Sequence, residues 1–195
     1  MLSYEVHGLR VSSSAVRAAL AAGDMAEAAA LLGRPYSVSG RVVHGARLGR
    51  ALGETSAGRG DGFRTLNLRF PHPRPAAMGI FVVRVHGLGS TSHERPVAGV
   101  ASLGKRPTVD DSGRVLLEVH CLEWPDALGP EGGYGRLVRV ELLHKLRDEA
   151  RYDSLAELAA AIGRDVVDAR DFLAADAAAH AAHAATGRQT TRDRI

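Results

Sequence analysis

The chain has 195 residues and a mass of 20.6 kDa, enough for one domain with its own core but too little for two full catalytic domains. Its single cysteine, Cys121, cannot close an internal disulfide or build a thiolate metal site. The net charge of +3 is spread along the chain without a block of one sign, which argues against a nucleic-acid partner. No stretch approaches the roughly 20 apolar residues that cross a bilayer, and no signal-peptide pattern opens the chain, so we expect a cytoplasmic protein without a membrane partner.

The N-terminal part has the pattern of two short helices within residues 12 to 33. Ser12 to Ser14 can cap the first helix and Gly23 can end it. Asp24 and Glu27 resemble a capping pair for the second helix, which Gly33 ends. The faces of both helices are rich in alanine, which suggests weak packing on the rest of the protein.

From Tyr36 onward the sequence changes to segments rich in Val and Leu that are separated by Gly, Pro or Ser. The candidate strands are residues 36 to 45, 79 to 88, 95 to 104, 114 to 124 and 136 to 146. Five or six strands in succession without helices between them predict a mainly β fold, either an antiparallel barrel or a sandwich.

A last helix is expected to begin at Asp153 and Ser154, where Ser154 and Glu157 have the spacing of a capping box. Its apolar stripe should pack on the barrel and consists of Leu155, Leu158, Ile162, Val166, Ala169 and Leu173. From Ala174 the apolar periodicity stops, so we expect the last ten or more residues to be frayed.

Two polar loops are the expected places for a binding site on a rigid barrel, residues 45 to 63 and 104 to 113. The first loop is rich in glycine but contains no Walker P-loop motif. Its backbone N–H groups, with Arg47 and Arg50, can bind phosphate. A surface insertion without function explains the same composition equally well.

Thr65 and Asn67 lie two residues apart, so both side chains point to the same side of an extended segment. A hydroxyl and an amide oxygen placed together can hold a hard cation such as Mg²⁺ with phosphate oxygens. The alternative is an ordinary polar strand face.

Glu118 interrupts a strongly apolar strand. Alternation places Val115, Leu117, Val119 and Cys121 on one face, and Leu116, Glu118, His120 and Leu122 on the other. A carboxylate in this position can act as the general base for a hydroxyl that attacks a phosphoryl group. The alternatives are a solvent-facing partner for an arginine at Glu118 and a half-buried structural role for His120.

Together these segments resemble the riboflavin kinase module of the bacterial bifunctional riboflavin kinase/FMN adenylyltransferase. The resemblance runs from about Gly33 to Leu173. It is carried by LGRPYSVSGRVVHGARLGR (32 to 50), GFRTLNL (62 to 68), GIFVVRV (79 to 85), GVASLGKRPTVDDSG (99 to 113), LLEVHCLEW (116 to 124) and VELLHKLRDEARYDSLAELAAAI (140 to 162).

The resemblance implies a small six-stranded antiparallel Greek-key β-barrel with a C-terminal helix and an ATP-dependent riboflavin kinase activity that makes FMN. Its substrates would be ATP and riboflavin, and a separate adenylyltransferase is a candidate partner. It implies that Thr65 and Asn67 hold Mg²⁺, or Zn²⁺ or Mn²⁺, with the ATP phosphates, and that Glu118 is the catalytic base. The glycine-rich flap over the nucleotide would comprise Gly40, His44, Gly45 and Gly49. The loop that closes on the flavin would comprise Arg106, Pro107 and Thr108.

The chain departs from the family pattern at three places. The motif Pro-Thr-Ala-Asn reads Arg64-Thr65-Leu66-Asn67 here, and residues 52 to 63 form a longer link than usual. Residues 11 to 17, VSSSAVR, resemble the end of the adenylyltransferase domain, whose nucleotide-binding His-x-Gly-His segment does not occur in the chain. We therefore expect an adenylyltransferase remnant at 1–33, the kinase barrel at 34–175 and a flexible tail at 176–195.

Three hypotheses remain on the sequence alone. The first is the kinase, with FAD synthesis left to a separate adenylyltransferase. The second is a catalytically inactive flavin- or nucleotide-binding relic, which would tolerate the loss of Glu118. The third, an RNA-binding barrel, would need stacking aromatic residues on its strands, yet aromatic residues are only 5% of the chain.

Overall fold

The computed structural model describes residues 5, 6, 8–44, 65–69, 75–89, 95–105, 115–124, 128 and 133–192. Its helices are α1 (Ser13–Ala22), α2 (Met25–Leu32) and α4 (Leu155–Arg192). Its barrel strands are β3 (Tyr36–Val43), β4 (Thr65–Arg69), β5 (Gly79–His86), β6 (Val97–Lys105), β7 (Val115–Cys121) and β8 (Leu137–Arg147). Two short strands that the sequence did not predict, β1 (Glu5–Val6) and β2 (Leu9–Arg10), pair with each other.

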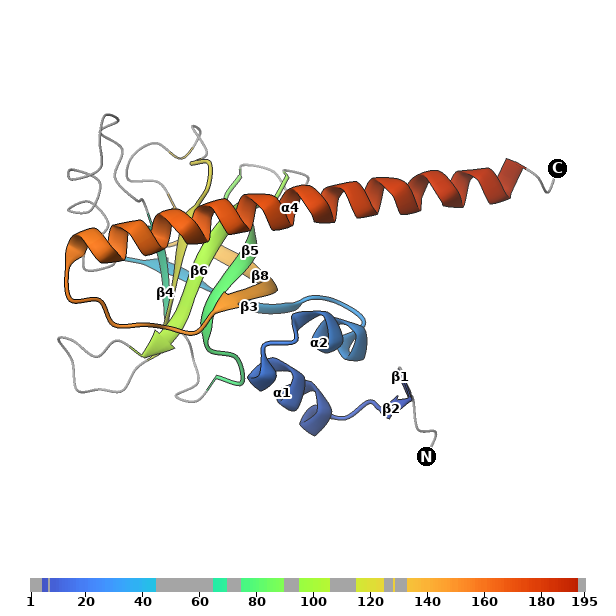
Figure 1. The fold of residues 1–195 in the computed structure, drawn as a ribbon, viewed down its shortest axis with the longest axis horizontal. Coiled ribbons are helices and arrows are strands. Elements are labelled where there is room, and N and C mark those ends of the chain that lie inside the picture. The colour runs from blue at the N-terminus through green and yellow to red at the C-terminus, as the bar shows by residue number, and fades with distance from the viewer. Residues whose placement is uncertain are drawn as a thin grey trace.

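The six long strands form a closed antiparallel barrel in the order β3-β4-β7-β6-β5-β8 (Figure 1). Strand alternation explains how the barrel is filled: in β7 the side chains of Val115, Leu117, Val119 and Cys121 are buried, whereas the residues between them are half-buried. The predicted fold class and the predicted faces of this strand are therefore confirmed.

Helices α1 and α2 are capped as expected. The Ser12 side chain accepts a hydrogen bond from the Ala15 N–H, and Asp24 accepts one from the Glu27 N–H. Gly23 and Gly33 end the two helices with φ of 81° and 67°, a left-handed conformation that glycine adopts without strain.

The expectation of weak packing for these helices is wrong. Leu20, Met25, Ala28 and Leu31 are buried in the same apolar cluster as the barrel interior, and α2 contacts β3 and β8. A Cβ at Gly23 would lie 2.5 Å from Cδ of Lys145 in β8, so the turn between the helices touches the barrel directly. Three long side chains, those of Leu20, Met25 and Leu31, were sufficient, although most of the helix surface is alanine.

Helix α4 crosses the outside of the barrel and covers a second apolar cluster (Figure 1). This cluster joins Ile80 and Val82 of β5 and Val100 of β6 to Ala169 of the helix. The helix continues to Arg192, past residue 175, and its described side chains from 177 to 182 are exposed. Leu155, predicted to belong to the packed stripe, is exposed because it stands in the first turn, before the helix reaches this cluster.

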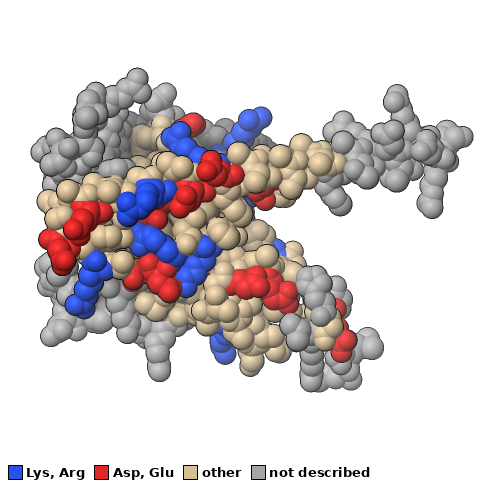
Figure 2. All heavy atoms as spheres, in the orientation of Figure 1, with Lys and Arg blue, Asp and Glu red and all other residues tan. Residues whose placement is uncertain are grey.

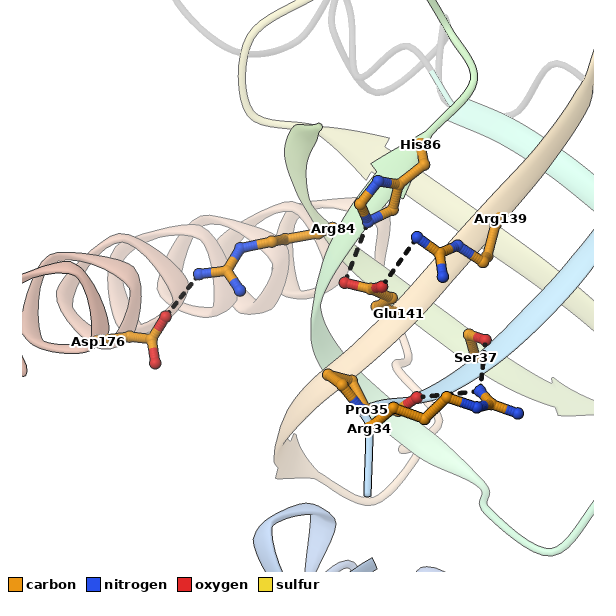
Figure 3. Close-up of polar contacts among 8 residues, drawn as sticks. All are labelled: Arg34, Pro35, Ser37, Arg84, His86, Arg139, Glu141 and Asp176. Atoms are coloured by element: carbon orange, nitrogen blue, oxygen red, sulfur yellow. Dashed lines mark hydrogen bonds and ion pairs between the residues drawn. The ribbon is translucent and has the colours of Figure 1, made fainter. Parts of the chain in front are cut away.

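Charged side chains fasten α4 to the barrel. Arg147 of β8 donates from Nε to Oδ1 of Asp165 at 2.8 Å and from Nη2 to Oδ2 at 2.7 Å, and Asp165 is buried. The hydrogen bonds that Arg147 donates to Asp165 raise the pKa of Arg147 above its usual value, so this guanidinium stays charged at every practical pH. Figure 3 shows a second pair farther along the helix, in which Arg84 of β5 reaches Asp176 at 2.5 Å.

We predict that Arg147→Met destabilises the protein by about 3 kcal/mol, because it leaves the buried Asp165 carboxylate without its bidentate partner. Urea unfolding of the variant measures this loss. Asp148→Ala is the control: it removes an exposed carboxylate paired with Lys145 and should cost no more than about 1 kcal/mol. The double variant Arg147→Met/Asp165→Leu should recover most of the stability, and a double variant as unstable as the single one would contradict this account.

On the face shown in Figure 2, basic and acidic side chains alternate over α4 and the barrel beneath it, so the described residues of this face form no continuous basic patch. Within the described part of the chain, no helix is long and apolar enough to cross a membrane. Burial in the barrel raises the pKa of Cys121 to about 12, so its thiol is neutral near pH 7.

Candidate active site

The barrel register places three polar residues side by side on the outer face of adjacent strands. Asn67 of β4 pairs with Glu118 of β7, and Glu118 pairs with Ser102 of β6. We call these three residues the polar row. Asn67 and Glu118 belong to strands that are distant in sequence, whereas Ser102 and Glu118 belong to consecutive strands. The Cβ atoms of neighbours in the row are about 5 Å apart, as in any antiparallel pair.

Asn67 has the most constrained environment of the row. Its neighbours Leu66 and Leu68 point into the barrel core, so its own side chain lies on the opposite face, yet the residue is only 4% exposed. Its Nδ2 lies 3.5 Å from Oγ1 of Thr65, a long hydrogen bond. No described residue provides a hydrogen bond to the buried Oδ1. An amide oxygen left buried without a partner costs free energy, so this atom is a candidate ligand-binding group.

Glu118 stands directly beside Asn67 and is half-buried on the same face. His120, two residues on, is half-buried opposite Thr65, in agreement with the burial predicted for it. The row thus brings together an amide oxygen, a hydroxyl and a carboxylate, which is a suitable set for holding a hard cation and for accepting a proton.

The end of β3 is held beside the row. Val43 of β3 pairs with Asn67, and the ring of His44 stacks on Tyr134 with 3.8 Å between ring centroids. Tyr134 stands between Gly133 and Gly135, both with positive φ, and the Gly135 N–H donates to the carbonyl of Val42 at 2.9 Å. This turn therefore holds the end of β3 beside the row.

Comparisons with known proteins show the family of the chain. The family model for riboflavin kinase matches residues 32–173. The chain belongs to the riboflavin kinase family. The matched segment contains the whole barrel and the part of α4 that packs on it.

The curated relatives of the chain are named as bifunctional enzymes, with a riboflavin kinase and an FMN adenylyltransferase activity. The chain is 44% identical over 165 residues to the bifunctional riboflavin kinase/FMN adenylyltransferase of Escherichia coli K12, covering 85% of this chain and 47% of that protein. It is 40% identical over 173 residues to the enzyme of the same name from Pseudomonas fluorescens, covering 89% of this chain and 50% of that one. The chain therefore spans about half the length of these relatives.

A solved structure also resembles this chain. It is described as a macrolide-efflux protein from Streptococcus pneumoniae and has a TM-score of 0.67 with 28% sequence identity, covering 86% of this chain and 49% of the other. The likeness supports the fold of the chain.

The structure brings together only some of the residues predicted for the site. Thr65, Asn67 and Glu118 are adjacent, and His44 lies at the end of β3. Gly40 lies in the middle of β3, where an added Cβ would make ordinary contacts of 3.5 Å or more, so sterics in the described structure do not require glycine there. The remaining predicted residues lie outside the described part of the chain: Gly45, Gly49, Arg106, Pro107, Thr108 and the long link at 52–63.

Sequence reasoning missed Tyr134 and the pair formed by Ser102 and Glu149. The run Gly133-Tyr134-Gly135 was a usable signal, because two glycines around an aromatic residue indicate a tight turn that presents a ring. No local signal marked Ser102 or Glu149, since they meet only through the barrel register and the loop after β8.

Proposed function

We propose that this chain is a riboflavin kinase, which transfers the γ-phosphate of ATP to the 5′-hydroxyl of the ribityl chain of riboflavin and releases FMN and ADP. The observation that carries the proposal is the adjacency of Asn67, whose buried Oδ1 has no partner among the described residues, and Glu118 on the next strand. The family membership supports riboflavin as the acceptor, and the adjacency of Asn67 and Glu118 supports phosphoryl transfer to its hydroxyl.

Asn67 and Thr65 are the residues that would hold the divalent cation of the reaction, Mg²⁺ in our proposal. The orphaned Oδ1 of Asn67 and the neighbouring Oγ1 of Thr65 are hard oxygen donors, so the residues present fit such an ion. When bound, the cation would neutralise charge on the ATP phosphates. The leucine at position 66 does not disturb this pair, because its side chain points into the barrel core.

Glu118 would act as the general base. As the ribityl oxygen forms its bond to the γ-phosphorus, the bond from that phosphorus to the β,γ-bridging oxygen breaks, and the hydroxyl proton passes to the Glu118 carboxylate. The transfer is direct and in line, without a phosphoenzyme. His44, with Gly40, Gly45 and Gly49, is proposed to cover the nucleotide, and Arg106, Pro107 and Thr108 to close on the flavin, which would exclude water from the transfer.

The product FMN is expected to be used by an adenylyltransferase, the second activity in the names of the curated relatives. We propose that residues 1–33 correspond to the end of that domain and that 34–175 form the kinase unit. Residues 176–192, expected to belong to a flexible tail, are part of helix α4. The use of ATP supports the cytoplasm as the compartment.

The test is product formation from riboflavin, ATP and Mg²⁺, with FMN and FAD separated by chromatography and ADP measured in the same samples. We expect equal amounts of FMN and ADP, no FAD, and no product after removal of divalent cations with EDTA. Folded protein that binds riboflavin but forms no FMN would contradict the proposal and would instead identify a catalytically inactive flavin-binding barrel.

A further inference from the structure

A second carboxylate lies at the end of the polar row. Glu149 stands in the segment between β8 and α4, and its Oε1 accepts a hydrogen bond from Oγ of Ser102 at 2.9 Å. Ser102 is the cross-strand partner of Glu118. Glu149 is exposed, so a molecule that binds along the row can reach its carboxylate.

The Glu149 carboxylate lies directly over Gly104 of β6. A Cβ at Gly104 would lie 1.9 Å from Oε2 of Glu149 and 2.1 Å from Oε1, so any other residue would displace the carboxylate. The backbone of Gly104 has no positive φ that would demand glycine. The absence of a side chain at this position leaves the space that the Glu149 carboxylate occupies.

A separate observation, made at Asn67, supports a ligand along the row. At its other end, the side chain of Asn67 is buried and its Oδ1 has no partner among the described residues. Along the row, Asn67 supplies an amide for cation and phosphate and Glu118 supplies a base. Ser102 supplies a hydroxyl that is hydrogen-bonded to the Glu149 carboxylate.

The distance along the row suits a polyol. One strand spacing of about 5 Å separates Glu118 from Ser102. An acceptor whose terminal hydroxyl lies at Glu118 therefore extends the next part of its chain toward Ser102 and Glu149. A carboxylate accepts hydrogen bonds only, through two oxygens, so Glu149 suits neighbouring hydroxyl groups.

We propose that Glu149, oriented by Ser102, is a positioning residue that accepts hydrogen bonds from the inner hydroxyls of the ribityl chain. This inference rests on the proposed function, since it assumes a flavin acceptor. Glu149 thereby selects acceptors with a hydroxylated side chain over acceptors with a plain alkyl chain.

The test compares two acceptors, riboflavin and a flavin that carries a 5-hydroxypentyl chain in place of ribityl. Glu149→Ala should raise KM for riboflavin about tenfold, the value of a hydrogen bond to a charged group, with KM for ATP unchanged. It should leave KM for the hydroxypentyl flavin at the wild-type value. Asp148→Ala is the matched control. It removes the same charge from the residue next to Glu149, and the Asp148 carboxylate pairs with Lys145, which lies outside the row.

Binding without ATP, measured by quenching of flavin fluorescence, separates this inference from the proposed function. A wild-type protein that makes no FMN contradicts the proposed kinase activity. The Kd values of wild type and Glu149→Ala for the two flavins still test the role of Glu149 in that case. Equal losses for both acceptors in Glu149→Ala, or a loss of the same size in Asp148→Ala, would overturn the proposal.

Discussion

Glu118→Gln should lower kcat for FMN formation by about 10²- to 10⁴-fold, the usual contribution of a general base. Glutamine keeps the shape of the side chain on β7 but cannot take the proton from the ribityl hydroxyl. Binding of riboflavin and ATP should change little, because the substitution removes an interaction made in the transition state. The measurement is steady-state kinetics beside Kd values from fluorescence quenching.

Glu123→Gln is the matched control for this variant. Glu123 is exposed just after the end of the same strand, outside the polar row, so its substitution should leave kcat unchanged. Wild-type activity in Glu118→Gln would show that another group accepts the proton. A fall in kcat that is accompanied by loss of the folded state in urea titration would assign Glu118 to structure instead.

Asn67→Leu should make the protein more stable and at least about 10²-fold less active. The buried Oδ1 has no described partner, and relief of such a group by an apolar side chain of similar size is worth about 1–3 kcal/mol. The same change removes a proposed oxygen ligand of the cation, so activity falls. A gain of stability at the expense of function is expected where a site holds a polar group in reserve for its ligand.

Two measurements check this prediction, urea unfolding without added metal and the thermal shift on addition of Mg²⁺ with ATP. Wild-type protein should be stabilised by the ligands, and Asn67→Leu should lose most of that shift because stabilisation follows binding. Thr65→Val is the comparison: it removes the other oxygen, but Thr65 is only half-buried, so the gain in stability should be smaller. An Asn67→Leu variant that is less stable than wild type would show that Asn67 supports the fold rather than a ligand.

Elements that depend on local chemistry were predictable from the sequence. The caps at Ser12, Asp24, Gly23 and Gly33 form because their partners are three or four residues away, so the chain contains the whole motif in one place. The alternation around Glu118 likewise follows from the period of a strand. The pair of Thr65 and Asn67 was located for the same reason, and the family resemblance gave the two residues and Glu118 a common purpose.

Contacts between distant segments were decided only by the tertiary structure. Strand pairing places Asn67 beside Glu118, and Glu118 beside Ser102, although no local pattern specifies which residues of two strands become partners. The burial of α1 and α2 against the barrel depended on a few large side chains meeting its interior, which the alanine-rich composition concealed. The Glu149 carboxylate lies in the open space above Gly104, which only the folded barrel creates. The sequence by itself thus determined the strands, the caps and the reactive side chains, whereas the closure of the barrel determined their neighbours, because register is a property of paired strands and not of either strand alone.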